Sequence, residues 1–248
     1  MNLRGRVAIV TGGNREIGRA ITTALAKEGT SVVICFLNDK GMAAETLKIV
    51  ENGGGKGVIC RVDVTRSRDV DGMVREVMDR FGRIDILVNN ARAYIQRRDF
   101  SDTDWDDFQR HIDVTLKGIF NCCKAAITSM KEQRYGRIIN ILSSLTDDPV
   151  RGYSSYISAL SAIIGFSKSL ALELGEYGIT VNNISPGFTV TAHTPYTSTD
   201  VKNRIAKMTP LKRLALPDDI AKSVLFYASN LSDFITGDNM IVDGGVVM

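Results

Sequence analysis

Short runs of β-branched residues alternate with longer segments of helical period along nearly the whole 248-residue chain. The first run, Val7 to Thr11, is typical of a buried strand, and apolar residues at helical spacing follow between Ile17 and Leu25. The same pattern predicts strands over 31–36, 57–62, 84–89, 137–141, 180–184 and 239–242, and helices over 42–50, 70–77, 116–134, 153–176 and 217–228.

Seven strands separated by helices predict an α/β fold with one parallel sheet, because right-handed crossovers place helices above and below such a sheet. We therefore predict a doubly wound, seven-stranded sheet, with residues 1–248 forming a single domain. Ligands of these sheets bind beyond the carboxyl ends of the strands. The predicted strand ends at Thr11, Asn89, Ile141 and Ile184 should therefore meet at one cleft.

Charge and hydropathy exclude several classes of protein. Lys and Arg number 31 against 28 Asp and Glu, which gives a formal net charge of +3 with both signs interspersed. A nucleic-acid binder needs a basic patch that follows the phosphate backbone, and none is visible here. The N-terminal apolar run breaks after a few residues and no later uninterrupted run reaches eighteen, so we expect a cytoplasmic protein with no membrane partner.

The chain has four cysteines and two histidines, which offer few ligands for a metal and few residues for nucleophilic catalysis. The cysteines, Cys35, Cys60, Cys122 and Cys123, lack metal-ligand spacing, and we expect buried thiols in a reducing compartment. His111 and His193 are far apart, which argues against a metal site and against a Ser-His-Asp triad. We expect both to be surface or hydrogen-bonded residues.

Short motifs lie at or near the predicted strand ends. The glycine-rich turn Thr11-Gly12-Gly13-Asn14-Arg15-Glu16-Ile17-Gly18 follows the first strand, Asp63-Val64 follows the third, and Asn89-Asn90-Ala91-Arg92 ends the fourth. Ser143 lies thirteen residues before Tyr156, Pro186-Gly187 and Thr191 follow the sixth strand, and Phe234-Ile235-Thr236-Gly237 and Val242-Asp243-Gly244-Gly245 close the chain. This set, in this order, resembles the short-chain dehydrogenase/reductase family from nearly end to end, including its 3-oxoacyl-carrier-protein reductase type.

The resemblance implies a Rossmann-like fold with strand order 3-2-1-4-5-6-7 and hydride transfer between a nicotinamide and a carbonyl or alcohol. Tyr156 would exchange the proton and Ser143 would orient the substrate oxygen. The pocket for a small-molecule carbonyl substrate would be lined by 145–152 and by 188–209, a Thr-, Ser- and Pro-rich segment of weak periodicity and a candidate lid. The implied cofactor contacts are Gly12, Asn14, Arg15, Ile17, Gly18, Asp63, Val64, Asn89, Ala91, Pro186, Gly187 and Thr191.

Four positions depart from the family's pattern. The lysine expected four residues after the tyrosine, where it activates the phenol and binds the ribose, is Leu160, and the next lysine lies too far along the helix to replace it. The asparagine of the central helix corresponds to Thr115. Glu16 replaces the middle glycine of the turn, and Arg92 replaces the glycine after Asn-Asn-Ala.

Glu16 is expected to weaken cofactor binding. A carboxylate about 5 Å from a phosphate costs on the order of 3 kcal/mol at an effective dielectric near 20. Two placements of its side chain stay open: at the phosphate position, where the helix dipole favours it, or out in solvent. A third hypothesis pairs Glu16 with Arg92 across the groove.

Two functions of different classes stay open. Arg15, and the absence of an acidic residue at 35–37, favour NADP(H) over NAD(H) if a dinucleotide binds at all. The chain is then a reductase with Tyr156 as the acid, because proton donation suffers less than proton abstraction from the loss of the lysine. Alternatively, it is a catalytically silent pseudoenzyme, a structural or regulatory subunit beside an active homologue. Either form implies a homo- or hetero-oligomer, a dimer or tetramer formed through 116–134, 153–176 and 239–242.

Overall fold

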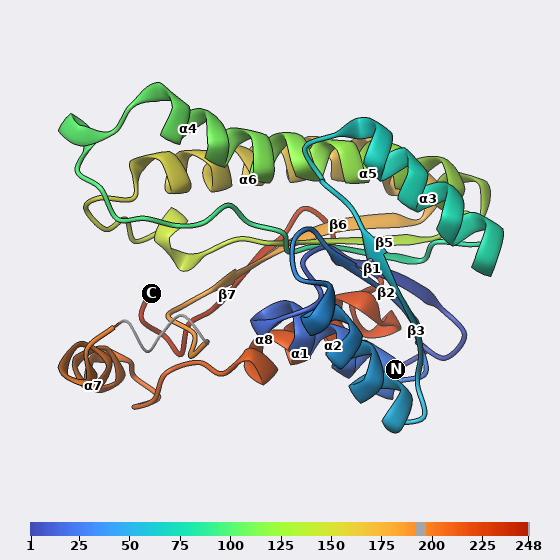
Figure 1. The fold of residues 1–248 in the computed structure, drawn as a ribbon, viewed down its shortest axis with the longest axis horizontal. Coiled ribbons are helices and arrows are strands. Elements are labelled where there is room, and N and C mark those ends of the chain that lie inside the picture. Colours follow the sequence, from blue (N-terminus) through green and yellow to red (C-terminus); the bar gives the residue numbers. More distant parts are fainter. Residues whose placement is uncertain (192–196, 248) are drawn as a thin grey trace.

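The computed structural model describes residues 1–191 and 197–247, whose strands form one seven-stranded parallel sheet (Figure 1). Its order, β3-β2-β1-β4-β5-β6-β7, confirms the predicted doubly wound, Rossmann-like α/β fold. The strands are β1 (Val7–Val10), β2 (Ser31–Phe36), β3 (Lys56–Arg61), β4 (Ile86–Asn89), β5 (Gly136–Ile141), β6 (Ile179–Pro186) and β7 (Asn239–Val242). The α-helices are α1 (Glu16–Lys27), α2 (Lys40–Asn52), α3 (Ser67–Phe81), α4 (Trp105–His111), α5 (Gly118–Glu132), α6 (Ser154–Leu174), α7 (Thr199–Met208) and α8 (Pro217–Ala228).

The chain reverses its direction of travel across the sheet at β1. In the sheet register, Ile9 of β1 pairs with Val33 of β2 on one side and with Leu87 of β4 on the other. The crossovers after β1 and after β4 therefore lead away from each other, which leaves a crevice at the carboxyl ends of these two strands.

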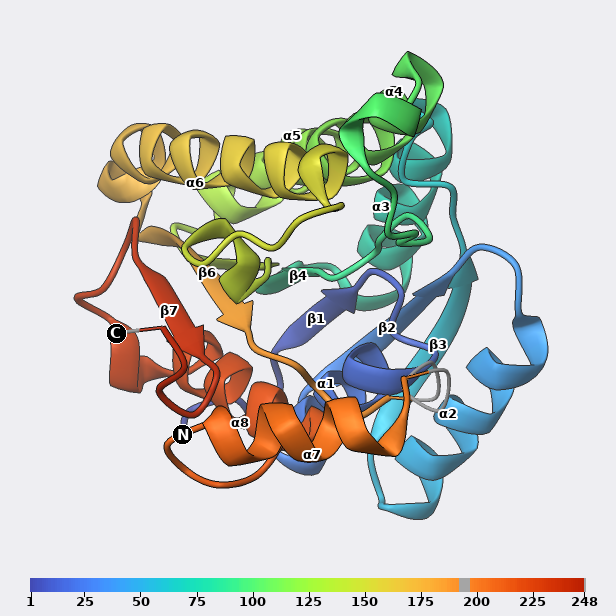
Figure 2. The same ribbon diagram turned by 90° about the vertical axis from the view of Figure 1, so that its left-hand side faces the viewer.

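Two hydrophobic layers hold helices on the two faces of the sheet. Helices α3, α5 and α6 cover one face and α1, α2 and α8 cover the other (Figures 1 and 2). Fully buried Ile21 and Leu25 of α1 and Tyr227 of α8 pack in the second layer. Burial of a large apolar side chain stabilises a fold by about 1.5–3 kcal/mol, so these stripes fix how each helix faces the sheet.

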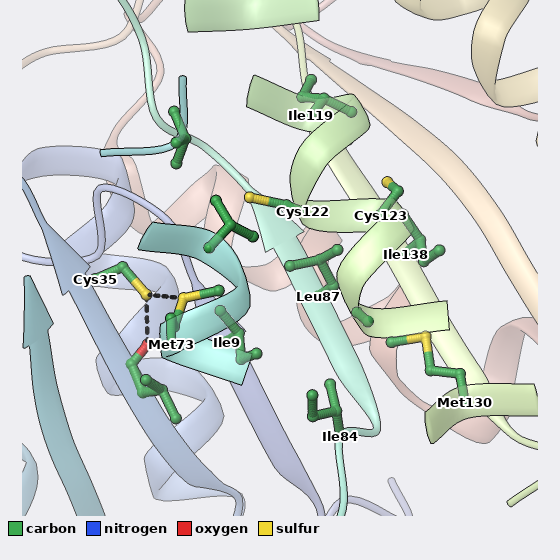
Figure 3. Close-up of a cluster of buried hydrophobic side chains, with 14 of the residues drawn as sticks. Ile9, Cys35, Met73, Ile84, Leu87, Ile119, Cys122, Cys123, Met130 and Ile138 are labelled. Atoms are coloured by element: carbon green, nitrogen blue, oxygen red, sulfur yellow. Dashed lines mark hydrogen bonds between the residues drawn. The ribbon is translucent and has the colours of Figure 1, made fainter. Parts of the chain in front are cut away.

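The four cysteines lie in the first layer, as expected for small buried residues. All are free and buried, and the Cys35 thiol lies 3.2 Å from the sulfur of Met73 (Figure 3). Burial raises the pKa of Cys60 to about 11 and that of Cys123 to about 12. These thiols are therefore packing residues and not nucleophiles.

The candidate lid 188–209 contains a helix that the sequence did not predict. Helix α7 (Thr199–Met208) is capped by Ser198, whose hydroxyl accepts a hydrogen bond from Val201 N, and it buries none of its residues. An apolar stripe is the signal that predicts a surface helix, and Val201 and Met208 are instead exposed. The part of the candidate lid at 192–196 lies outside the described residues.

Among the described residues, one helical segment, Ser154–Tyr177, is long and apolar enough to cross a membrane by length and composition. Its mean hydropathy is 1.4, and 33% of its most apolar window is buried. The segment comprises α6 and the short turn after it, and here it packs on the sheet beside α5 (Figure 1). Its serines interrupt the apolar run, which is why run length alone did not select it.

Candidate functional site

A cleft of about 660 Å³ opens at the carboxyl ends of the strands. Gly12, Asn90, Ser143 and Pro186, each at or just beyond a strand end, all line it. The predicted convergence of these strand ends on one cleft is therefore present. A second cavity of about 570 Å³, lined by Arg6, Tyr135 and Phe234 among others, contains none of the predicted site residues.

In the glycine-rich turn, the backbone at Gly12 lies in close contact with the backbone at Gly18 in the first turn of α1. Gly12 has a φ of +62°, which favours glycine, and a Cβ on Gly18 would lie only 2.0 Å from the Gly12 carbonyl oxygen. Thr22 of α1 donates a 3.1 Å hydrogen bond to the Gly13 carbonyl. The turn is thus packed tightly on α1, whose N-terminus is the positive end of the helix dipole and favours an anion.

Glu16 opens α1 in a backbone conformation that is suited to glycine. Its φ is +52°, its side chain is half-buried, and it lines the cleft. A left-handed non-glycine residue costs about 1 kcal/mol or more in backbone strain. The position therefore has a backbone conformation that favours glycine, and its side chain adds a carboxylate to the wall of the cleft.

Asn90, which was not predicted as a site residue, ties the end of β4 to the glycine-rich turn. Its side-chain amide donates to the carbonyls of Thr11 at 3.1 Å and Gly12 at 3.2 Å. The Thr11 hydroxyl in turn accepts from the backbone N–H groups of Asn90 and Ala91. The available sequence signal was the second Asn of the Asn-Asn pair, and only the fold shows which of the two faces the turn.

Asn89 is directed into the sheet and does not line the cleft. Its side-chain nitrogen donates to Asn140 at 2.8 Å, and Asn140 donates to Asn183 at 3.1 Å and to Ser167 at 3.0 Å. These buried amides link β4, β5, β6 and α6 just below the cleft. Asn89 thus supports the strand ends, and its role as a cofactor contact stays a prediction.

The side of the cleft that the sequence predicts for the adenine is formed by the ends of β2 and β3. The Asp63 carboxylate accepts from Thr65 N at 3.0 Å and from the Thr65 hydroxyl at 2.7 Å, so it organises the turn before α3 while also lining the cleft with Val64. Leu37, the residue after β2, lies on the same wall of the cleft, and Arg15 is exposed at the rim. Asn14 is buried and holds the turn against α2, since its carbonyl accepts from Thr46 at 2.9 Å.

The side of the cleft that the sequence predicts for the nicotinamide is shaped by the C-terminal motif. Gly187 N donates to the Val242 carbonyl at 3.0 Å, and a Cβ on Gly187 would lie 2.6 Å from the Cβ of Asp243. The Asp243 carboxylate accepts from the N–H groups of Gly245 and Val247, both at 2.8 Å. The closing motif therefore fixes the path of the chain through Pro186 and Gly187, and Thr191 follows on the cleft wall.

Ser143 lines the cleft, whereas Tyr156 is not one of its lining residues and lies behind Arg92, which is. Ser143 accepts a 3.3 Å hydrogen bond from Leu145 N, and Tyr156, on the first turn of α6, is 4% exposed. Leu160 is fully buried in the layer beneath α6. Thr115 is buried in the π-helical segment Ile112–Lys117. Helix α6 therefore offers the Tyr156 phenol no cation.

Arg92 supplies a cation at that position. Its Nη1 donates to the Tyr156 hydroxyl at 3.0 Å and its Nη2 to the Leu142 carbonyl at 2.6 Å. The hypothesis of a pair between Arg92 and Glu16 is wrong, because the guanidinium points instead toward Tyr156 and no ion pair joins the two within the described ranges. Both residues still line the cleft.

His111 is buried against Tyr156, with the two ring centroids 5.8 Å apart in an edge contact. Burial, together with the charge of Arg110, lowers the pKa of His111, so the ring is neutral near pH 7. The expected surface position is therefore wrong for this histidine. His193 lies outside the described residues.

Comparisons with known proteins agree with this architecture. A family model described as enoyl-(acyl carrier protein) reductase matches residues 12–247. A solved structure of a mutant short-chain dehydrogenase/reductase from Serratia marcescens is 31% identical with a TM-score of 0.93, and the match covers 100% of both chains. The chain belongs to the short-chain dehydrogenase/reductase family.

Curated relatives within the family match over their full length. The 3-oxoacyl-(acyl-carrier-protein) reductase FabG of Escherichia coli is 37% identical over 251 residues, 100% of each chain. The protein of the same name from Staphylococcus epidermidis is 36% identical over 244 residues, 97% of this chain and 98% of its own. A solved 7α-hydroxysteroid dehydrogenase complexed with NADH and 7-oxo glycochenodeoxycholic acid is 30% identical with a TM-score of 0.93, covering 98% and 96%. The chain is thus a member of an oxidoreductase family.

Proposed function

We propose that the chain is a cytoplasmic, NADP(H)-dependent reductase of small carbonyl compounds. The observation that carries the proposal is the dinucleotide cradle: Gly12 and Gly18 pack without side chains at the start of α1, in the same cleft that Ser143 lines. Arg15 at the rim, with Leu37 in place of an acidic residue, supports a preference for the 2′-phosphate of NADP(H). Relatives named 3-oxoacyl-carrier-protein reductases support 3-oxo thioesters as the first substrate class to assay.

The residues present fit this cofactor, with one exception. The cleft has the volume that a dinucleotide requires, and the N-terminus of α1 on its wall favours an anion through the helix dipole. Glu16 opposes a diphosphate by charge. We therefore propose binding that is weakened but not abolished.

Ser143 and Tyr156 each have a role in reduction. When bound, the nicotinamide supplies a hydride to the carbonyl carbon. The Ser143 hydroxyl orients the substrate oxygen, and the Tyr156 hydroxyl gives its proton to that oxygen, which leaves a phenolate and an alcohol. The Tyr156 oxygen accepts a hydrogen bond from Arg92, which leaves the hydroxyl proton free to be donated in the reductive direction.

Calorimetric titration with NADPH and NADH, followed by a carbonyl assay, tests the proposal. Micromolar binding of NADPH with turnover of a 3-oxo thioester or another carbonyl would support it. No binding at millimolar cofactor would refute it in favour of the silent-subunit function, which Glu16 on the cleft wall and Leu160 in the core favour.

We also propose that residues 1–248 form one domain and assemble into a homo-oligomer. All described strands join one sheet, which supports a single domain. Large apolar side chains are exposed on the helices implied for assembly: Leu172 on α6 is 87% exposed, and Phe120 on α5 is 46% exposed. Light scattering on the purified chain distinguishes a dimer or tetramer from a monomer that requires a homologous subunit. We propose no nucleic-acid, membrane or metal partner.

A further inference from the structure

We propose that Arg92 is the positioning cation for Tyr156, replacing from the loop after β4 the charge that α6 lacks at Leu160. The inference rests on the proposed reductase function. Arg92 and Tyr156 are 64 positions apart in sequence, and the fold brings the guanidinium Nη1 to 3.0 Å from the phenol oxygen. This contact joins the inner end of the cleft to the start of α6.

The direction of this hydrogen bond suits a proton donor. An arginine N–H only donates, so the Tyr156 oxygen accepts and its own proton stays available for a substrate oxygen. The second anchor, Nη2 to the Leu142 carbonyl at 2.6 Å, fixes the plane of the guanidinium. Leu142 directly precedes Ser143, so the same side chain also sets the phenol relative to the serine.

The charge of Arg92 is not neutralised by a carboxylate within the described ranges. His111 from α4 packs against Tyr156, and burial lowers the pKa of this histidine. Arg110 of the same helix lines the cleft and is paired with Asp107 at 3.5 Å. A guanidinium stays protonated over the whole working pH range. Arg92 therefore stabilises the phenolate that remains after Tyr156 gives up its proton.

The opposite side of Tyr156 has no room for such a group. Leu160, four residues on and on the same helical face, is fully buried among apolar residues that include Ile163. A lysine there would need the polar surroundings that this layer lacks. The fold therefore leaves a cation free to approach the Tyr156 phenol from the cleft side.

Replacing Arg92 by Met, which keeps much of the length without charge, tests the inference in two independent ways. First, the pH at which the Tyr156 phenol ionises is measured without cofactor, as the difference in tyrosinate absorbance between each protein and its Tyr156→Phe partner. We expect the Arg92→Met change to move this ionisation to higher pH, because the phenolate loses its charged hydrogen-bond donor, and Arg92→Lys to move it less. Arg97→Met, on the same loop at an exposed position, should leave it unchanged.

Second, kinetics separate chemistry from binding. We expect Arg92→Met to lower kcat about a hundredfold and to change KM for NADPH less than about threefold. Arg92→Lys should recover part of the lost kcat. Thermal melting of each variant confirms that it is folded.

The two proposals fail separately. An unchanged phenol ionisation in folded Arg92→Met and Arg92→Lys proteins would overturn the role of Arg92, and so would a higher kcat in Arg92→Met, which would show that Arg92 obstructs the cleft. If the phenol responds to Arg92 but no carbonyl is turned over by the unmodified chain, the contact with Tyr156 stands and the reductase function is wrong.

Discussion

The side-chain amide of Asn90 donates a 3.2 Å hydrogen bond to the carbonyl oxygen of Gly12. This contact joins the carboxyl ends of β1 and β4 at the point where the chain reverses its direction across the sheet. It also fixes the Gly12 peptide in its left-handed conformation at the mouth of the cradle. The proposed cofactor site therefore depends on a residue from the middle of the chain as well as on the N-terminal turn.

Replacing Asn90 by Ala removes both donors to the turn. Two backbone carbonyls, those of Thr11 and Gly12, lose their side-chain partner, which should cost about 1–3 kcal/mol in the free energy of unfolding and about tenfold in NADPH affinity. Denaturant titration and calorimetry measure the two effects. Asn52→Ala, at the exposed end of α2, is the matched control and should change neither. Unaltered cofactor affinity in Asn90→Ala would contradict this role.

Replacing Glu16 by Gly should raise NADPH affinity by tenfold or more. The change removes a carboxylate from the cleft wall and relieves a φ of +52°, but glycine also adds entropy to the unfolded chain, so stability should change by less than about 1 kcal/mol. Calorimetry at two salt concentrations checks the charge effect, which salt should diminish.

The control for Glu16 is a residue with the same backbone strain far from the cleft. Arg134, between α5 and β5, has a φ of +49° and is exposed. Arg134→Gly should leave cofactor affinity as it is. An equal gain in both variants would show that backbone strain, and not charge, limits binding.

Coenzyme preference should depend on Arg15 and Leu37. Arg15→Ala should lower NADPH affinity about tenfold and leave NADH affinity within about twofold, because only the 2′-phosphate loses a charged partner. Leu37→Asp should reverse the preference, since a carboxylate at the end of β2 repels that phosphate and accepts from a ribose hydroxyl. Lys27→Ala, at the exposed end of α1, is the control. Equal loss of both coenzymes in Arg15→Ala would show that Arg15 binds the diphosphate instead.

The cysteines should resist thiol reagents in the folded protein at pH 8. Burial raises the pKa of Cys60 to about 11 and of Cys123 to about 12, so the reactive thiolate is scarce and shielded. A colorimetric disulfide reagent should label fewer than one thiol per native chain within minutes, and all four after unfolding. Rapid labelling of a native cysteine would contradict the buried placement.

The same thiols set an alkaline limit on stability. Their folded pKa values lie above the unfolded value near 9, so their contribution is fully present below pH 9 and is lost as pH rises through about 11. Each such thiol should lower the free energy of unfolding by about 1.4 kcal/mol per pH unit in that window. Denaturant titrations at pH 8, 9.5 and 10.5 measure the slope, and Cys60→Ala should reduce it.

The order of strands and helices could be predicted from the sequence because hydrophobic periodicity is a local property. The β-branched runs from Val7 to Val242 mark buried parallel strands, and the motifs at their ends mark one cleft. Helix α7 was missed although Val201, Ile205 and Met208 recur at helical spacing, because the helix is short and the segment before it is rich in Thr, Ser and Pro.

The sequence by itself therefore determined the fold, the family and the loss of a lysine at Leu160. The directions of side chains were decided only by the tertiary structure: Asn89 turns into the sheet and Asn90 toward the turn, although they are adjacent, because successive residues at a strand end face opposite ways. In the sequence, Arg92 was likewise visible only as the residue that replaces the glycine after Asn-Asn-Ala. Its contact with Tyr156 exists because the register of β4 against β5 brings two distant segments to one point, and no local pattern encodes that distance.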